Sequence, residues 1–255
     1  MTTKVVSLFA LALFASAPQL VFAHEEESRV AIEADVTGPM PAGAITYKFE
    51  LVDTKTNQLL KDSDFTISHE KILHMLAYDP ALKEFQHIHP EFDGHFWVVD
   101  LNFARNGNYW LWVQGELASD GEEFSSSTRL EIFGGQSACS TPPVLTDLRS
   151  GSDGSSTAQM SGQTVRAGQM VTLDVVLGRN DGSQPVNTPY LAAFAHIIAV
   201  PEDADSLIHV HPMNGSQSNQ GMLHVTFPQA GFYRLWVQFM DDGTLKVVPL
   251  SVQVF

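Results

Sequence analysis

The sequence predicts an all-β protein made of two tandem Ig-like or cupredoxin-like β-sandwich domains, and three observations support this. Short segments such as residues 29–36 and 244–255 alternate apolar and polar residues, as half-buried strands do. Gly, Pro, Asn and Asp separate these segments, and no long stripe has a helical period. The chain also repeats itself, and about seven short strands in roughly 110 residues per copy suit a sandwich.

The internal repeat covers a whole domain. His74, followed by Phe85-Gln-His87-Ile-His89-Pro90, recurs as His196, followed by Leu207-Ile-His209-Val-His211-Pro212. In both copies the first histidine precedes the second by 13 positions (87 − 74 and 209 − 196). Downstream, Tyr109-Trp-Leu-Trp-Val-Gln114 is matched by Tyr233-Arg-Leu-Trp-Val-Gln238. Solenoid units are about 20 to 50 residues long, so this longer period indicates duplication of a domain.

The start of the chain resembles a secretory signal peptide. Lys4 precedes a largely apolar run that ends in Val21-Phe22-Ala23. Pro18 and Gln19 interrupt this run before it reaches the roughly 18 to 20 apolar residues that a membrane span needs. We therefore expect cleavage after Ala23 rather than a membrane anchor, and a periplasmic or secreted protein that is not integral to the membrane.

Composition completes the predicted domain plan. Ser, Thr, Gly and Pro dominate the middle of the chain, which predicts a linker. The expected segments are a signal peptide (1–23), a first sandwich (24–135), a linker (136–162) and a second sandwich (163–255). The only cysteine, Cys139, falls in this linker and cannot form an internal disulfide.

The acidic charge restricts the partners. The formal net charge is −15, and removal of Lys4 with the signal peptide makes it −16. A polyanion such as nucleic acid or an anionic membrane would be repelled, whereas cations would be attracted.

The repeated histidines have the spacing of a metal site. Side chains alternate across a strand, so His87 and His89 lie on one face, as do His209 and His211. If Tyr78 pairs with Phe85 in a hairpin, His74 falls opposite His89. Imidazole nitrogen suits copper or zinc far better than calcium or magnesium. We therefore predict one copper or zinc site per half, with these ligands: His74, His87 and His89 in the first, and His196, His209 and His211 in the second.

Several other residues are secondary candidates. His69 has Leu191 as its counterpart, so it could add a ligand to the first site only. His24 would become the mature N-terminus after cleavage, where its amine and ring resemble the histidine brace of copper proteins. Near the two motifs lie possible additional donors, with oxygen in Glu91 and Asp93 and sulfur in Met213 and Met222.

On these motifs, together with His69-Glu-Lys-Ile-Leu-His74 and Tyr190-Leu-Ala-Ala-Phe-Ala-His196, the sequence resembles exported bacterial YtkA-like, Ig-like proteins. The resemblance spans most of residues 30–255. Such proteins are often found beside heavy-metal and copper efflux systems, so the resemblance implies export, a β fold, a metal-related role and an efflux or other envelope protein as partner.

Three functions remain open at this point. The first is buffering, sensing or transfer of copper or zinc in the cell envelope. The second is a non-enzymatic interaction module whose histidines form structural hydrogen bonds. The third is a metalloenzyme with an open three-histidine site, for which the sequence offers no nucleophile, phosphate loop or paired-carboxylate motif.

Overall fold

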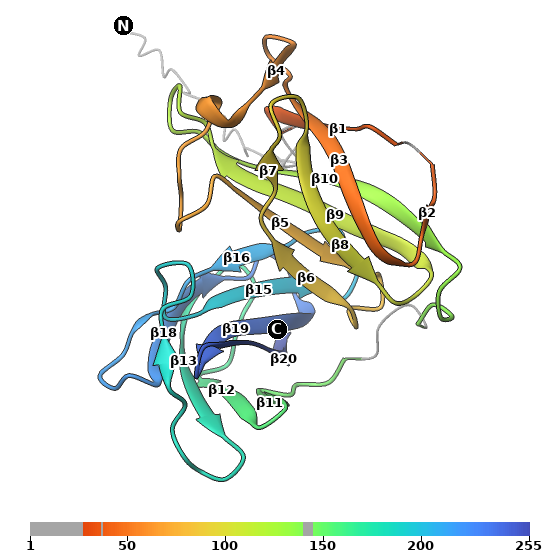
Figure 1. Cartoon of the computed structure of the whole chain (residues 1–255). Helices are drawn as coiled ribbons and strands as arrows, with labels where there is room; N and C mark the ends of the chain where they lie inside the picture. The colour runs from red at the N-terminus through yellow and green to blue at the C-terminus, as the bar shows by residue number, and fades with distance from the viewer. Residues whose placement is uncertain (1–27, 37, 140–144) are drawn as a thin grey trace, which may run out of the picture.

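The computed structural model describes residues 28–36, 38–139 and 145–255. The predicted signal peptide and His24 lie outside these residues. Each half of the described chain forms two five-stranded sheets (Figure 1), which confirms the all-β expectation. The helical structure found there is the 3-10 turn η1 (Asp62–Asp64). In the described ranges no helix has the length and apolar character needed to cross a bilayer.

The first half pairs two sheets in a sandwich. One sheet has the order β1-β3-β8-β7, with β4 also paired to β3, and the other has the order β2-β10-β9-β5-β6. The strand bounds are β1 (Val30–Ala34), β2 (Met40–Pro41), β3 (Gly43–Asp53), β4 (Gln58–Leu60), β5 (Leu73–Tyr78), β6 (Phe85–Ile88), β7 (Glu91–Phe92), β8 (Trp97–Phe103), β9 (Gly107–Glu116) and β10 (Glu123–Phe133).

The second half repeats this plan. One sheet has the order β11-β12-β13-β18-β17, and the other has the order β14-β19-β15-β16 with β20 paired along β19. The strand bounds are β11 (Ser150–Asp153), β12 (Ser156–Gly162), β13 (Met170–Arg179), β14 (Asn187–Thr188), β15 (His196–Pro201), β16 (Ile208–Val210), β17 (Met213–Asn214), β18 (Gln220–Thr226), β19 (Gly231–Asp241) and β20 (Thr244–Val254).

The second sandwich starts earlier than the composition suggested. β11 and β12 lie inside the segment 136–162 that we expected to be a linker. Ser and Gly conceal the strand pattern there, yet Ser156, Ala158 and Met160 alternate as buried residues along β12. Because Ala158 and Met160 belong to the second core, this segment is part of that domain.

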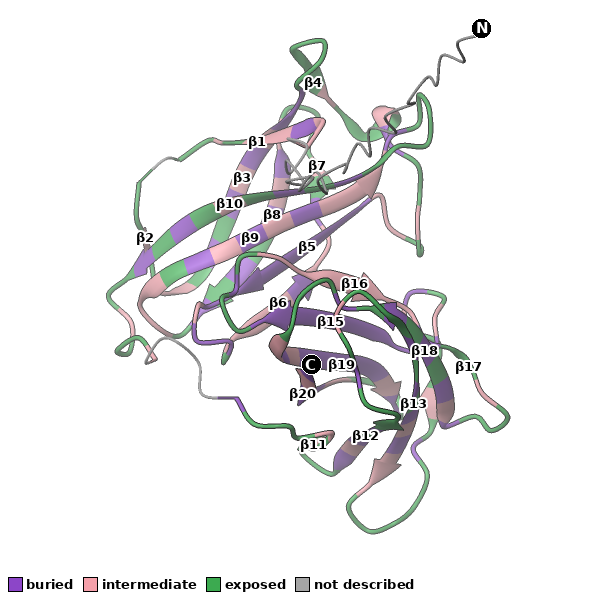
Figure 2. Ribbon diagram, turned by 180° about the vertical axis from the view of Figure 1, so that it is seen from behind, coloured by how far each residue is buried: buried purple, intermediate pink, exposed green. Residues whose placement is uncertain are grey.

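Each sandwich has its own apolar core, but β5 and β15 are buried on both faces. Every residue of these two strands is buried (Figure 2). Met75 and Ile197 face the cores of their own domains. Leu76 and Ile198, one position later, face the other domain. A strand covered on both sides carries a continuous apolar run, as both of these strands do.

A third apolar cluster joins the two domains. Its buried members come from both halves: Leu76, Tyr78, Leu82, Leu145, Ile198, Val200, Ala204 and Trp236. Phe85 stacks on Trp236 with ring centroids 4.4 Å apart. The Tyr78 hydroxyl donates to the carbonyl of Ala204 at 3.1 Å. The outer faces of the β5 and β15 sheets are therefore an interface between the domains, and this interface carries the histidines.

Candidate metal centre between the domains

The hairpin that we predicted from the first motif is present. Tyr78 pairs with Phe85 and Leu76 with His87 in the β5–β6 ladder. The second half has the same hairpin, in which Ile198 pairs with His209. His89 and His211 directly follow the last residues of β6 and β16. Each hairpin therefore brings its three histidines together on the outer face of its own domain.

The six histidines form one cluster across the interface, whereas the sequence suggested separate sites in the two halves. The rings of His87 and His209 have centroids 5.3 Å apart, and those of His74 and His209 are 5.6 Å apart. The ring nitrogens form two groups, and within each group they lie within 4.8 Å of one another. One group contains His74, His87 and His89, and the other contains His87, His196 and His209, so that His87 belongs to both. The duplication itself explains this, because equivalent outer faces pack against each other.

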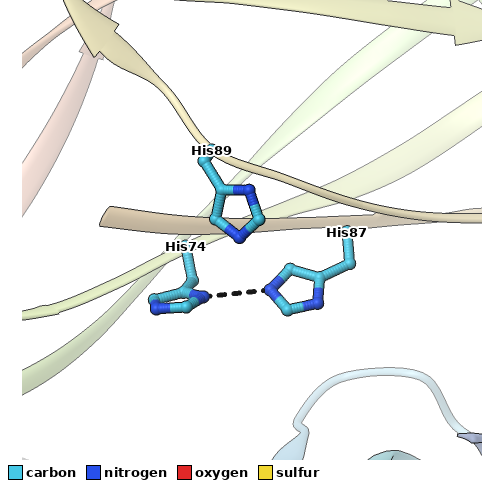
Figure 3. A group of neighbouring side chains, drawn as sticks. All are labelled: His74, His87 and His89. Atoms are coloured by element: carbon cyan, nitrogen blue, oxygen red, sulfur yellow. Dashed lines mark hydrogen bonds between the residues drawn. The ribbon is translucent and has the colours of Figure 1, made fainter. Parts of the chain in front are cut away.

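In the first group, three ring nitrogens converge (Figure 3). Nδ1 of His74 is 3.0 Å from Nε2 of His87. The ring of His89 lies over the gap between the other two rings, and its lower nitrogen points toward them. The Nε2 atom of His89 is buried and has no hydrogen-bond partner among the described residues. A buried nitrogen without a partner is costly, so it indicates a ligand at this point.

In the second half, the nitrogens meet at His196. Its Nδ1 is 3.2 Å from Nε2 of His209 and 2.9 Å from Nε2 of His211. His211 therefore joins the cluster through His196, and His87 approaches from the first domain.

Two backbone carbonyls orient the first histidine of each half. Nε2 of His74 donates to the Ser68 carbonyl at 3.1 Å, and Nε2 of His196 donates to the Tyr190 carbonyl at 3.0 Å. Each carbonyl begins a tight turn whose two central residues have positive φ without being glycine, namely His69 and Glu70 in one and Leu191 and Ala192 in the other. Such backbone strain persists where the surrounding structure enforces it, as it often does at functional sites.

Two glutamines orient the second histidine of each half, and each comes from the opposite domain. Nδ1 of His87 donates to Oε1 of Gln238 at 2.7 Å, and Nδ1 of His209 donates to Oε1 of Gln114 at 3.0 Å. The amide nitrogen of Gln114 donates to Ser125 Oγ, which directs its carbonyl oxygen toward His209. Gln114 and Gln238 occupy matching positions of the repeat, and we predicted no role for them from the sequence. Their shared position beside the histidine motifs was the available signal.

The hydrogen bonds to the carbonyls and glutamines leave the other ring nitrogen of each histidine with a free lone pair that points into the cluster. A neutral imidazole has one N–H and one lone pair, and the carbonyl acceptors take the N–H of each of these four rings. Nδ1 of His74 and Nε2 of His87 then face each other as two acceptors. A tetrahedral ion with metal–nitrogen bonds of about 2.0 to 2.1 Å separates neighbouring nitrogens by about 3.3 Å. The observed distances of 3.0 and 3.2 Å are close to this value, so the residues fit a copper or zinc ion.

The surroundings keep the rings neutral. Burial, together with the neighbouring imidazoles, lowers the pKa of His87, His89 and His196 to about 3 and that of His211 to about 4. Burial also lowers the pKa of His74, and it lowers the pKa of His209 well below the usual value. Metal ligation needs the unprotonated ring, so the cluster is prepared for a cation at neutral pH.

The secondary candidates differ in how close they lie to the histidine cluster. The ring of His69 stacks on that of His211, with centroids 3.9 Å apart. Asp93 instead accepts hydrogen bonds from the backbone N–H groups of His95 and Phe96. Met213 and Met222 pair across β17 and β18 and are exposed. Among His69, Asp93 and the two methionines, it is His69 whose ring contacts the cluster.

Comparisons with known proteins add little about function. A family model described as a domain of unknown function (DUF8832) matches residues 150–255, less than half of the chain, and the match begins where β11 begins. The sequence matched none of the curated proteins with which it was compared.

Among the solved structures that resemble the chain, two each align with 88% of it. The fibronectin(III)-like modules of Clostridium thermocellum CbhA are 11% identical, with a TM-score of 0.23 and 93% of that chain covered. A putative membrane anchored protein from Corynebacterium diphtheriae is 10% identical, with a TM-score of 0.22 and 58% of that chain covered. These scores are too low to support any argument about function. The sheet order and the ring distances make the chain a pair of β-sandwich domains with a histidine cluster at their interface.

Proposed function

We propose that this is an exported protein that binds copper or zinc in the histidine cluster between its domains and buffers, senses or transfers that metal in the cell envelope. The observation that carries the proposal is the buried Nε2 of His89, which has no hydrogen-bond partner in the described part of the chain and lies within 4.8 Å of the ligand nitrogens of His74 and His87. An unpaired ring nitrogen beside the lone pairs of other rings gains most from a cation when it too presents a lone pair.

The donor set supports copper or zinc as the metal. Imidazole nitrogens suit these ions, and three protein ligands with an open position are typical of sites where a ligand can exchange. The negative charge of the chain also favours the approach of cations.

Titration of the mature chain with Zn²⁺ and with Cu²⁺ tests the binding. We expect uptake at neutral pH and loss of uptake when the six cluster histidines are replaced by Gln. Replacement of the exposed His95 and His224 by Gln is the matched control and should leave uptake unchanged. The absence of uptake by the unaltered protein would refute the metal-binding proposal.

Export requires a separate test. Cell fractionation should place the protein in the periplasm or the medium, and the first residue of the mature chain should be His24. A mature chain that retains residues 1–23 would contradict cleavage at this position.

One observation favours an alternative, an interaction module with structural histidines. His87 and His209 form hydrogen bonds with Gln238 and Gln114 and thereby connect the domains. Under this alternative, replacing His87 and His89 with Ala would lower stability, and the metal content would be the same with and without the substitutions.

A further inference from the structure

A cavity of about 430 Å³ opens beside the histidine cluster on one side of the interface. Three cluster histidines line it, namely His74, His209 and His211, together with His69, Glu116 and Glu123. The cavity therefore connects cluster histidines from both domains to a set of polar side chains outside them.

His69 lines the cavity and lies next to the cluster. It is exposed, and its ring contacts a histidine of the other domain, His211, at 3.9 Å between centroids. The centroid of His196 is 5.9 Å away and that of His74 is 6.4 Å away. The tight turn from Ser68 to Lys71, closed by backbone hydrogen bonds at both ends, holds His69 at a φ of 50°. This turn keeps an accessible imidazole next to the buried ones.

Two carboxylates line the cavity without a basic partner. Glu116 and Glu123 are directly opposite each other in the β9–β10 ladder. Like charges in this position destabilise a sheet. Within the described residues neither carboxylate has a Lys or Arg within 4.0 Å, although other acidic groups of the domain do. Such a pair lowers the electrostatic potential for an approaching cation.

The corresponding positions of the second domain are apolar. The turn that corresponds to Ser68–Lys71 carries Leu191 in the place of His69. In the β19–β20 ladder, Met240 pairs with Leu245 where the first domain pairs Glu116 with Glu123. Duplication preserved the buried histidines and their glutamines, whereas the two outer edges of the cluster differ in chemistry.

We infer that this cavity is the port by which a copper or zinc ion enters and leaves the cluster, with His69 as a transient ligand between the carboxylates and His211. The inference rests on the proposed function, because it presupposes that the cluster binds metal. The exchange transfers one cation between oxygen and nitrogen donors and changes no oxidation state.

Stopped-flow transfer of Zn²⁺ between the mature protein and a chromophoric chelator tests the port. His69→Leu installs the counterpart residue and should slow both uptake and release by about tenfold, while the amount bound at saturation stays unchanged. The double variant Glu116→Gln, Glu123→Gln should slow uptake at low salt and weaken its dependence on ionic strength. Leu191→Met, on the opposite edge, is the control and should leave both rates unchanged.

The outcomes separate the port from metal binding itself. Unchanged rates in His69→Leu and in the double Gln variant, with full loading, would overturn the port and leave the proposed function intact. Loss of bound zinc in His69→Leu would also overturn it, because His69 would then be a permanent ligand. Failure of the unaltered protein to bind Zn²⁺ would refute the proposed function instead.

Discussion

Nδ1 of His87 lies 2.7 Å from Oε1 of Gln238, and these two residues belong to different domains and are 151 positions apart in the chain. The reciprocal contact joins His209 to Gln114. Each glutamine fixes the tautomer of a histidine in the other domain, so the cluster depends on the docking of both halves.

Removing both glutamine acceptors should weaken metal binding. In the double variant Gln114→Leu, Gln238→Leu the affinity for Zn²⁺ should fall by about 10- to 100-fold, because the rings lose their enforced tautomer. Gln→Glu at both positions retains an acceptor and should restore most of the affinity. Competition titration against a chelator measures the Zn²⁺ affinity of both double variants, with the exposed Gln169→Leu as control. Equal affinity in the Leu variant and the unaltered protein would show that the glutamines do not orient ligands.

Substitutions of two neighbouring residues of β15 can distinguish packing at the interface from packing in the domain core. Ile197→Ala and Ile198→Ala each remove a buried side chain, and each should cost about 2 to 5 kcal/mol of unfolding free energy. Ile198 faces the other domain, so only its substitution should also weaken Zn²⁺ binding. Thermal unfolding and zinc titration of both variants check this. Equal weakening by the two substitutions would mean that domain docking does not control the cluster.

Acid should destabilise the metal-free protein through its buried histidines. An imidazole in the unfolded chain has a pKa near 6.5. The folded pKa of His87, His89 and His196 is lowered, mainly by burial, to about 3. Below pH 6.5 the unfolded state therefore binds protons that the native state does not, and the unfolding free energy falls as the pH falls toward 3.

Urea unfolding at about pH 7 and about pH 5 measures this dependence. Replacing the six cluster histidines by Gln should flatten it, whereas His95→Gln with His224→Gln should not. The same pH dependence in the variant without cluster histidines would assign the effect to other groups.

The second domain has an ion pair that should contribute to its stability without contributing to metal binding. The Asp241 side chain is 3% exposed and accepts hydrogen bonds from Arg179 and Ser156. These contacts, with Arg179 as the largest cause, lower the pKa of Asp241 to about 2. Asp241→Ala leaves both donors without an acceptor and should cost on the order of 2 to 4 kcal/mol.

Denaturant unfolding of Asp241→Ala measures that cost, and the exposed Asp242→Asn is the control. Zinc uptake by the folded variant should be unchanged. Since the folded pKa of Asp241 is lowered, its contribution is complete above the unfolded pKa near 3.9 and is lost as the pH falls toward 2. Loss of zinc uptake in the folded variant would contradict the separation of this pair from the cluster.

The sequence predicted the sandwiches, the β5–β6 register and the grouping of three histidines within a hairpin, because these follow from local alternation and turn spacing. It did not predict the contact between the two hairpins, which depends on tertiary docking. The continuous apolar runs of β5 and β15 were the signal for a second buried face. β12 was also missed, since its Ser and Gly residues resemble a linker although Ala158 and Met160 lie in the core.

The most direct test of the shared cluster is anomalous X-ray diffraction from a crystal of the mature protein loaded with zinc or copper. We expect a peak between the two hairpins, with Nε2 of His87 and nitrogens of further cluster histidines about 2.0 to 2.1 Å from the metal. A loaded crystal with peaks only at the protein surface, or with all six rings hydrogen-bonded to protein groups around an empty centre, would contradict it.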